Sequence, residues 1–414
     1  MTRKLYYHDA LTLEFEAPAA SATGRGGRSA VALEATYFYP TSGGQPHDTG
    51  TLGGARVVEV TEEGDEVLHW LEGDPGPGPW KARIDAARRR DHMEQHTGQH
   101  VLSAAFVAAL KAPTVSFHMG AETSTIDVEL RDPSRLAEAE ALANRVVAED
   151  RPVTVYEAAR DQVEALGLRK PPAVDGSVRV VDVEGFDRSA CGGTHVATTG
   201  RIQLIKVLGA EKVRENCRVE FVCGGRALRD YATKHDALKR LSARFTTGVA
   251  QVEAVVEKKI EEAAAQRRSL EKLEQELAGY EAERFAREAV VVSAPGGPVT
   301  PEGPGGAAAP RLLVRWIEGR SAAYLRALSA GLQGREGLVY VLGLASDNPA
   351  WIVGHGPGVE LDLRVFWKEW SAGIGAKGGG KADLIQGGGL SGAAPADALG
   401  HAETMLRGTL GAGS

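Results

Sequence analysis

The pattern of apolar and polar positions predicts a β-rich beginning to the chain. Residues 31–39, 55–60 and 66–71 are rich in β-branched, aliphatic and aromatic side chains, and a Glu-Gly-Asp turn separates the last two runs. Such a pair of runs around a short turn is typical of a β-hairpin. A Gly- and Pro-rich run at 73–79 then interrupts the pattern. We therefore expect an N-terminal β-rich, barrel-like subdomain over residues 1–82.

The next segment mixes helical and strand patterns. A long helix is predicted from about residue 84 to residue 110, with Pro113 after its end, and a second helix from Asp132 to about residue 149. Apolar or alternating runs predict strands at 115–119, 124–130, 153–157, 178–183, 202–207 and 218–223. Residues 83–226 are therefore expected to form an α+β domain.

From residue 227 to about residue 290 the chain is charged and contains no Pro. Leu270, Leu273, Leu277 and Tyr280 follow the three-and-four spacing of a coiled-coil seam. The pattern fits a helical hairpin or short coiled coil, and it fits equally well an amphipathic helix that lies on a neighbouring domain. A helical segment is expected in both cases.

The last part of the chain predicts a separate α/β domain. Residues 293–310 are rich in Gly, Pro and Ala and are expected to be a linker. Strand patterns occur at 312–317, 338–342 and 351–354, helical patterns occur at 322–332, 363–371 and 396–410, and a glycine-rich run occupies 378–389. We expect a glycine-rich α/β domain over 311–414 and an α+β class for the whole chain.

Composition limits the function classes. The chain has 414 residues, 43% of them hydrophobic and 25% charged, which is typical of a globular protein with more than one domain. No apolar run is long enough to cross a bilayer. Three cysteines are too few for a disulfide framework and fit a cytoplasmic protein. The net charge of -7 means that nucleic acid would have to bind at local basic patches.

Two short motifs together predict a metal site. His96 and His100 stand four residues apart on the predicted long helix, so their imidazoles share one face. Cys191 and His195 stand at the two ends of a Cys-Gly-Gly-Thr-His string. Three imidazoles and a thiolate make a ligand set that suits tetrahedral zinc. Such a zinc is structural if its shell is closed, and catalytic if a water can enter the shell.

The residues around these motifs leave the choice between two histidine ligands open and disfavour one class of enzyme. His92 precedes His96 by one further turn and can replace His100 on spacing alone. Thr97 occupies the place where a zinc peptidase carries its glutamate base, which disfavours that class. Cys217 and Cys223 belong to a strand pattern and are expected to be structural. The loop Ser42-Gly43-Gly44-Gln45 is either an ordinary turn or a place where backbone amides approach a ligand.

With these three motifs in this order, the chain resembles the alanyl-tRNA editing proteins of the AlaX family, relatives of the editing domain of alanyl-tRNA synthetase. The stretch from Arg214 to Glu220 also resembles that family, and the glycine-rich tail is similar to the C-terminal domain shared by alanyl-tRNA synthetases and DHH phosphoesterases. No aminoacylation domain precedes the motifs, so the chain is not expected to charge tRNA. The absence of an Asp-His-His string disfavours a phosphoesterase.

The resemblance implies a zinc-dependent hydrolase that acts in trans on tRNA(Ala) wrongly charged with serine, or with glycine. It implies zinc as the cofactor, and His96, His100, Cys191 and His195 as its ligands. Gly43, Gly44 and Gln45 would offer backbone donors near the developing oxyanion. Ser116 and His118 would line the substrate pocket. The general base, and whether zinc binds the water or the substrate amino group, stay open.

Other partners and rival functions follow from the same comparison of motifs. Arg364, Lys368, Lys377 and Lys381 flank the glycine-rich run and are expected to meet tRNA phosphates, or the C-terminal half forms a homodimer. The simpler alternative is a flexible glycine loop. The rival functions are a deacylase of the threonyl-tRNA type and a non-catalytic tRNA-binding protein with a structural zinc.

Overall fold

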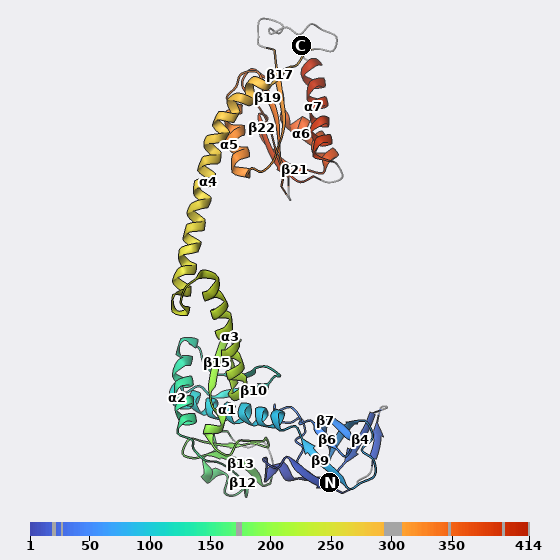
Figure 1. Ribbon diagram of the computed structural model, residues 1–414, viewed down its shortest axis with the longest axis vertical. Helices are drawn as coiled ribbons and strands as arrows, with labels where there is room; N and C mark the ends of the chain where they lie inside the picture. Colours follow the sequence, from blue (N-terminus) through green and yellow to red (C-terminus); the bar gives the residue numbers. More distant parts are fainter. Residues whose placement is uncertain are drawn as a thin grey trace. The chain divides into compact units, whose positions relative to one another are not determined.

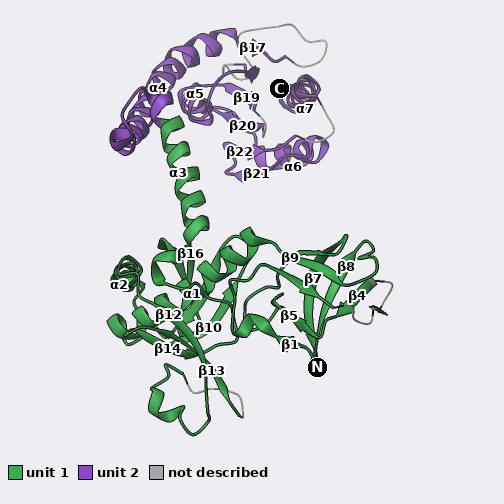
Figure 2. Cartoon of the chain, turned by 60° about the horizontal axis from the view of Figure 1, so that its bottom comes forward, with its two compact units in different colours: residues 1–241 green, residues 242–414 purple. Residues whose placement is uncertain are grey.

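The computed structural model describes residues 1–18, 22–25, 28–170, 176–293, 309–346, 349–390 and 394–412. It has the expected α+β composition, with several separate sheets and seven helices among these residues. The chain divides into two compact units, Met1–Leu241 and Ser242–Ser414 (Figure 2). Each unit has its own buried core and is described here by itself.

The first unit begins with a seven-stranded antiparallel sheet. In sheet order its strands are β2 (Glu14–Ala17), β9 (Trp80–Ile84), β6 (Gly50–Leu52), β7 (Ala55–Glu63), β8 (Glu66–Glu72), β4 (Arg28–Ala32) and β3 (Ala22–Arg25). The predicted hairpin is confirmed as β7 and β8. The sheet order begins at β2 and ends at β3, and no pairing between these two strands occurs in the described part. Side chains from β2, β4, β6, β7, β8 and β9 meet in one buried core.

The single strand predicted over 31–39 is wrong. The chain leaves β4 and pairs again only at β5 (Ala35–Thr36), in parallel with β1 (Arg3–Lys4). The Thr36 hydroxyl accepts the Phe38 amide and contacts buried His69, which turns the chain inward. Phe38 and Tyr39 are consequently buried beyond the end of the strand.

Helix α1 (Ala86–Leu110) is the central element of the rest of this unit. Asp85 caps its first turn, and nearly every side chain from His92 to Phe106 is buried. One surrounding sheet has the order β10 (Thr114–Met119), β11 (Ser124–Val128), β16 (Asn216–Cys223) and β15 (Ile205–Val213). A second has the order β12 (Val153–Ala158), β13 (Val178–Val183) and β14 (Asp187–Ala190), and α2 (Leu136–Ala148) packs beside α1. From His92 to Phe106 the helix therefore presents its side chains to other parts of the protein.

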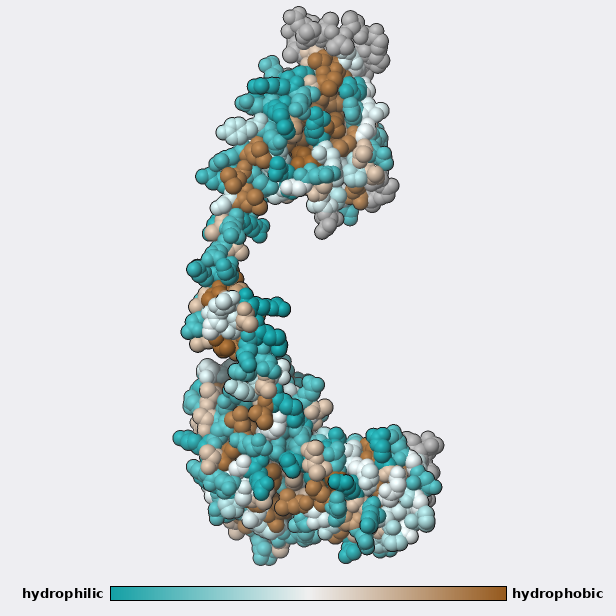
Figure 3. Space-filling model, viewed as in Figure 1, coloured by the Kyte–Doolittle hydropathy of each residue, from teal (hydrophilic) through white to brown (hydrophobic). Residues whose placement is uncertain are grey.

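The charged segment forms two helices, α3 (Gly224–Phe245) and α4 (Val252–Glu288), with a break at residues 246–251. The predicted seam does not face a partner in the described residues, because Leu270, Leu273 and Tyr280 are 59%, 62% and 79% exposed. Much of the surface of α4 is hydrophilic in the view of Figure 3. The buried stripe consists instead of small residues, namely Ala278, Ala282 and Ala286, which pack against α5 (Ala322–Gln333). The C-terminal part of α4 therefore lies on the C-terminal domain, which agrees with the second alternative only in part, because the segment forms two helices and not one.

The second unit is a six-stranded mixed sheet covered on both faces (Figure 1). Its strands in order are β17 (Val290–Val291), β18 (Arg311–Ile317), β19 (Leu338–Leu344), β20 (Ala350–His355), β22 (Leu384–Gly388) and β21 (Lys377–Gly380). Helices α4 and α5 pack on the face that carries Leu338 and Tyr340, and α6 (Leu363–Ile374) and α7 (Pro395–Ala412) pack on the face that carries Val339 and Val341. The predicted linker lies mostly outside the described residues.

The glycine-rich run is an ordered β-hairpin rather than a flexible loop. Strands β21 and β22 pair antiparallel, with Gly378 opposite Gly387. The Trp367 ring lies against both glycines, and an added Cβ would come within 2.8 Å of it at Gly378 and 2.3 Å at Gly387. The glycines are therefore explained by close packing under an indole ring.

No helix in the described part of the chain is long and apolar enough to cross a membrane.

Candidate metal centre

The structure brings together the four side chains that the sequence predicts as metal ligands. His96 and His100 lie on one face of α1, and Cys191 and His195 lie at the two ends of the loop that follows β14. One ligand atom from each lies within 4.8 Å of all the others. The Cys191 Sγ is 3.3 Å from the His96 Nε2 and 3.4 Å from the His195 Nε2. These separations are close to the edges of a tetrahedron with zinc–ligand distances of about 2.0–2.3 Å.

Each of the three imidazoles uses its Nδ1 for a contact outside the cluster. The Nδ1 of His96 is 2.8 Å from the Gln45 Oε1, that of His100 is 3.3 Å from the Asp187 carboxylate, and that of His195 is 3.2 Å from the Thr97 hydroxyl. The Nε2 atoms remain for the cluster. Outer hydrogen bonds of this kind hold metal-binding histidines in one tautomer and orientation. The donor set therefore fits a zinc ion.

Gln45 contacts the metal motifs through its side chain, whereas the sequence analysis predicts that its backbone amide donates to an oxyanion. Its side chain is fully buried, and the Oε1 accepts hydrogen bonds from the Thr194 amide and from His96, while the Nε2 donates to the Thr194 hydroxyl. Its backbone amide already donates to the Ser42 carbonyl. Gln45 is therefore placed to position His96 and the Cys-Gly-Gly-Thr-His loop, and its amide is not available to an oxyanion.

The two loop glycines have backbone conformations that favour glycine. Gly43 and Gly44 have φ angles of +56° and +85°, and no partner is recorded for their amides among the residues that the structure describes. A Cβ on Gly44 would lie 3.0 Å from the Phe117 ring, so the loop can follow this path only with a glycine there. The Phe117 ring centroid lies 5.5 Å from that of His96.

The predicted pocket residues Ser116 and His118 face away from the cluster. Side chains alternate along β10, and Phe117, which lies between them, is the one that faces His96. The Ser116 hydroxyl donates to Asp127, whose carboxylate also accepts from Arg218 on the exposed face of the sheet. Phe117, which the sequence analysis did not single out, takes the place expected of its neighbours.

The surroundings of Cys191 favour its thiolate. Burial alone would raise the pKa of this thiol, but the three neighbouring imidazoles lower it well below its usual value. Burial lowers the pKa of His195 to about 3. For His100, burial also lowers the pKa, yet Asp187 and Cys191 outweigh burial and raise it to about 9. The ionised sulfur is the form that binds a metal, whereas His100 would have to release its proton when a metal binds.

Asp187 is a functional candidate that the sequence analysis missed. Its carboxylate contacts the His100 Nδ1, accepts from the Arg169 Nε at 2.8 Å and accepts from the Ser189 hydroxyl at 3.0 Å. Burial raises its pKa, but His100 and Arg169 outweigh burial and lower it to about 2. No spacing rule connects Asp187 with His100, because strand β14 and helix α1 meet only in the folded chain.

The remaining candidates lie outside the cluster. His92 is buried and its Nδ1 has no hydrogen-bond partner, but it is not among the four clustered residues. Cys223 is buried against Gly98 of α1. The four basic residues near the glycine run belong to the other unit and are exposed there, namely Arg364, Lys368, Lys377 and Lys381. Of these, Arg364 is paired with Asp362 at 2.6 Å.

Comparison with known proteins agrees with this site. The family described as the second additional domain of threonyl and alanyl tRNA synthetases matches residues 178–220, which include Cys191 and His195. The alanyl-tRNA editing protein Aarsd1 of Mus musculus is 37% identical over 235 residues, which is 54% of this chain and 57% of that protein. The chain is therefore similar to alanyl-tRNA editing proteins over about half of its length. The alanine–tRNA ligase of Pyrococcus abyssi is 35% identical over 299 residues, which is 67% of this chain and 32% of the ligase.

The chain spans only part of each of these relatives, about a third of the ligase and just over half of the mouse protein. A solved structure is also similar to part of the chain, the C-Ala domain of Aquifex aeolicus alanyl-tRNA synthetase. It is 25% identical, covers 25% of this chain and 92% of that domain, and has a TM-score of 0.22.

Proposed function

We propose that this protein is a zinc-dependent hydrolase that removes serine, and also glycine, from wrongly charged tRNA(Ala). The observation that carries the proposal is the cluster of one thiolate and three buried imidazoles, each imidazole held through its Nδ1. Zinc bound there would act as a Lewis acid towards the ester that joins the amino acid to the tRNA.

The residues around the cluster have separate parts in this proposal. His96, His100, Cys191 and His195 hold the ion, and Cys191 alone among them is partly exposed, so the ester approaches from its side. The amides of Gly43 and Gly44 donate to the oxyanion that develops on the carbonyl. Phe117 covers one side of the cluster and excludes water from the His96 ring. Serine is chosen over alanine by a hydrogen bond to its hydroxyl.

Two other functions compete with this one. A deacylase of the threonyl-tRNA type fits the matched family, whose description covers both synthetases. The names of the relatives favour alanine tRNA. The other competitor is a non-catalytic tRNA-binding protein with a structural zinc, because four protein ligands can close a tetrahedral shell.

The deciding experiment incubates the protein with tRNA(Ala) charged with serine, glycine or alanine, and with tRNA(Thr) charged with serine. We expect fast release of serine from tRNA(Ala), slower release of alanine, and loss of release after chelation. Cys191→Ala should lose zinc and activity, and Cys217→Ala, a buried cysteine outside the cluster, is the matched control. Release of serine only from the threonine tRNA supports the first competitor. Zinc without any release supports the second.

We further propose that the second unit adds affinity for tRNA or a dimer contact. Lys377 and Lys381 stand at the two ends of edge strand β21 and are exposed there. If they meet phosphates, Lys377→Gln with Lys381→Gln should raise KM at low salt, and the difference should shrink as salt rises. If the unit dimerises instead, light scattering of the whole chain reports a dimer and KM is unaffected. A monomer with unchanged KM would contradict both.

A further inference from the structure

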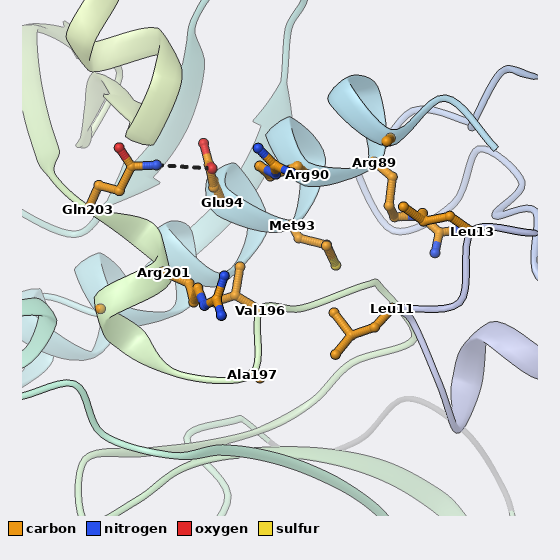
Figure 4. Close-up of a pocket in the computed structure, with 12 residues that line it drawn as sticks. Leu11, Leu13, Arg89, Arg90, Met93, Glu94, Val196, Ala197, Arg201 and Gln203 are labelled. Carbon is orange, nitrogen blue, oxygen red and sulfur yellow. Dashed lines mark hydrogen bonds between the residues drawn. The ribbon is translucent and has the colours of Figure 1, made fainter.

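A second cavity lies beside the metal centre in the first unit. It has a volume of about 470 Å³ and lies along the N-terminal half of α1 (Figure 4). Leu11, Leu13, Met93 and Val196 give it an apolar lining. Val196 directly follows the candidate ligand His195, and Met93 lies one helical turn before His96 on α1. The cavity and the metal centre therefore share two elements of backbone, and neither the metal motifs nor the glycine loop explains the cavity.

Two arginines without a partner border this cavity. Arg90 on α1 and Arg201 in the turn Thr199–Ile202 are both exposed, and no ion pair is recorded for either in the part of the chain described. The third arginine of the lining, Arg89, is different, because it is fully buried and paired with Asp48 at 2.5 Å. The cavity thus carries two available positive charges.

The nearby carboxylates do not neutralise these charges. Glu94 accepts hydrogen bonds from the Gly225 amide at 3.0 Å and from the Gln203 Nε2 at 3.3 Å. Asp150 accepts from the Gly200 amide at 2.9 Å. Both acids weaken the positive field of the arginines, but neither forms an ion pair with them. An apolar lining with two guanidinium groups at its border favours a ligand with a phosphate at one end and a flat, weakly polar group at the other.

We infer that this cavity binds one nucleotide of the single-stranded acceptor end of tRNA. Its phosphate lies between Arg90 and Arg201, and its base lies against Leu11 and Met93. This inference rests on the proposed function, because that function brings the esterified end of the tRNA to the metal centre. Arg90 precedes His96 by six residues, about 9 Å along the helix axis. The bound nucleotide is therefore a near neighbour of the terminal one, and its contacts carry affinity rather than base specificity.

The test measures binding of uncharged tRNA(Ala) to the whole chain over a range of salt concentrations. Arg90→Gln combined with Arg201→Gln should weaken binding roughly tenfold at low salt. It should also reduce the slope of log affinity against log salt by about 0.7, because the one phosphate between the two arginines is no longer neutralised. Arg56→Gln is the matched control, since Arg56 is exposed on strand β7 outside this cavity, and it should leave the slope unchanged.

A second variant separates the apolar part of the cavity from its charges. Leu11→Ser should weaken binding of uncharged tRNA(Ala) without changing the salt slope, because Leu11 carries no charge. Zinc content and the unfolding midpoint show that each variant is folded. The inference is overturned if the double arginine variant keeps the affinity and slope of the wild type, or if the wild type binds no tRNA.

Because this assay involves no hydrolysis, it can fail separately from the proposed function. A wild type that binds tRNA through these arginines yet releases no serine would refute the hydrolase and leave the nucleotide site standing. A wild type that releases serine while the double variant binds tRNA normally would refute the nucleotide site alone.

Discussion

Replacing Gln45 should weaken zinc binding although Gln45 is not a ligand. In Gln45→Met, the His96 Nδ1 and the Thr194 amide both lose their acceptor in a buried environment. An unsatisfied buried donor costs about 1–3 kcal/mol, so the two together destabilise the site by several kcal/mol before relaxation. Loss of such an outer contact to a metal-binding histidine typically reduces metal affinity by about 10–100-fold.

The assay is a zinc competition titration against a chromophoric chelator, run beside a denaturant unfolding curve of the metal-free protein. Gln45→Glu should keep zinc affinity within a few-fold of the wild type, because a carboxylate oxygen still accepts from both His96 and Thr194. Gln95→Met is the matched control. Gln95 is also fully buried and makes two hydrogen bonds to the Cys223 backbone, but it touches no candidate ligand.

We therefore expect Gln95→Met to lose stability and to keep its zinc affinity, whereas Gln45→Met loses both. Equal zinc affinity in Gln45→Met and the wild type would refute the argument that Gln45 positions His96. Equal loss in the Met and Glu variants would also refute it, since only one of them lacks the acceptor.

Two further predictions concern stability. Gly98→Ala should destabilise the protein by about 1–3 kcal/mol, because the added Cβ would lie 2.3 Å from the Cys223 Sγ and the helix would have to move. Thermal unfolding measures this as a lower midpoint, and an unchanged midpoint would contradict the prediction. Burial lowers the pKa of His69 to about 4, below its value of about 6.5 in the unfolded chain, so stability is complete above pH 6.5 and falls by up to about 3 kcal/mol as the pH drops towards 4. In His69→Gln, the free energies of unfolding obtained from denaturant titrations at pH 7.5 and pH 5 should differ by less than they do in the wild type.

Elements with a strong local signal could be predicted from the sequence. The long helix α1 has an N-cap at Asp85 and no proline between that residue and Pro113, and the hairpin of β7 and β8 has its turn at Gly64. The metal ligands could be predicted because each motif keeps its two members close in sequence. A pair at i and i+4 on a helix, or at the two ends of a five-residue loop, is constrained before the chain has folded.

Features that depend on tertiary contacts could not be predicted. The apolar seam at Leu270 and Leu273 has the right spacing for a coiled coil, but α4 packs through its alanines, because small side chains let α5 approach closely. The glycine run has the composition of a mobile loop, and only the position of Trp367 shows why a side chain is excluded there. Asp187 contacts His100 from a strand 87 residues further along the chain, a distance over which no pattern operates.

The metal centre depends on the β-rich beginning of the chain even though that region supplies no ligand. Gln45 reaches from this region to His96 and Thr194, and so it connects both metal motifs. The same region is fixed to α1 by Arg89, whose guanidinium is buried against Asp48 and donates to the carbonyls of Ala10 and Tyr37. A buried charge pair of this kind is strongly destabilised when one partner is removed. Gln45 of the Ser-Gly-Gly-Gln loop fixes the tautomer of His96, although the two residues belong to different parts of the first unit. This contact is a structural reason for the loop to occur together with both metal motifs.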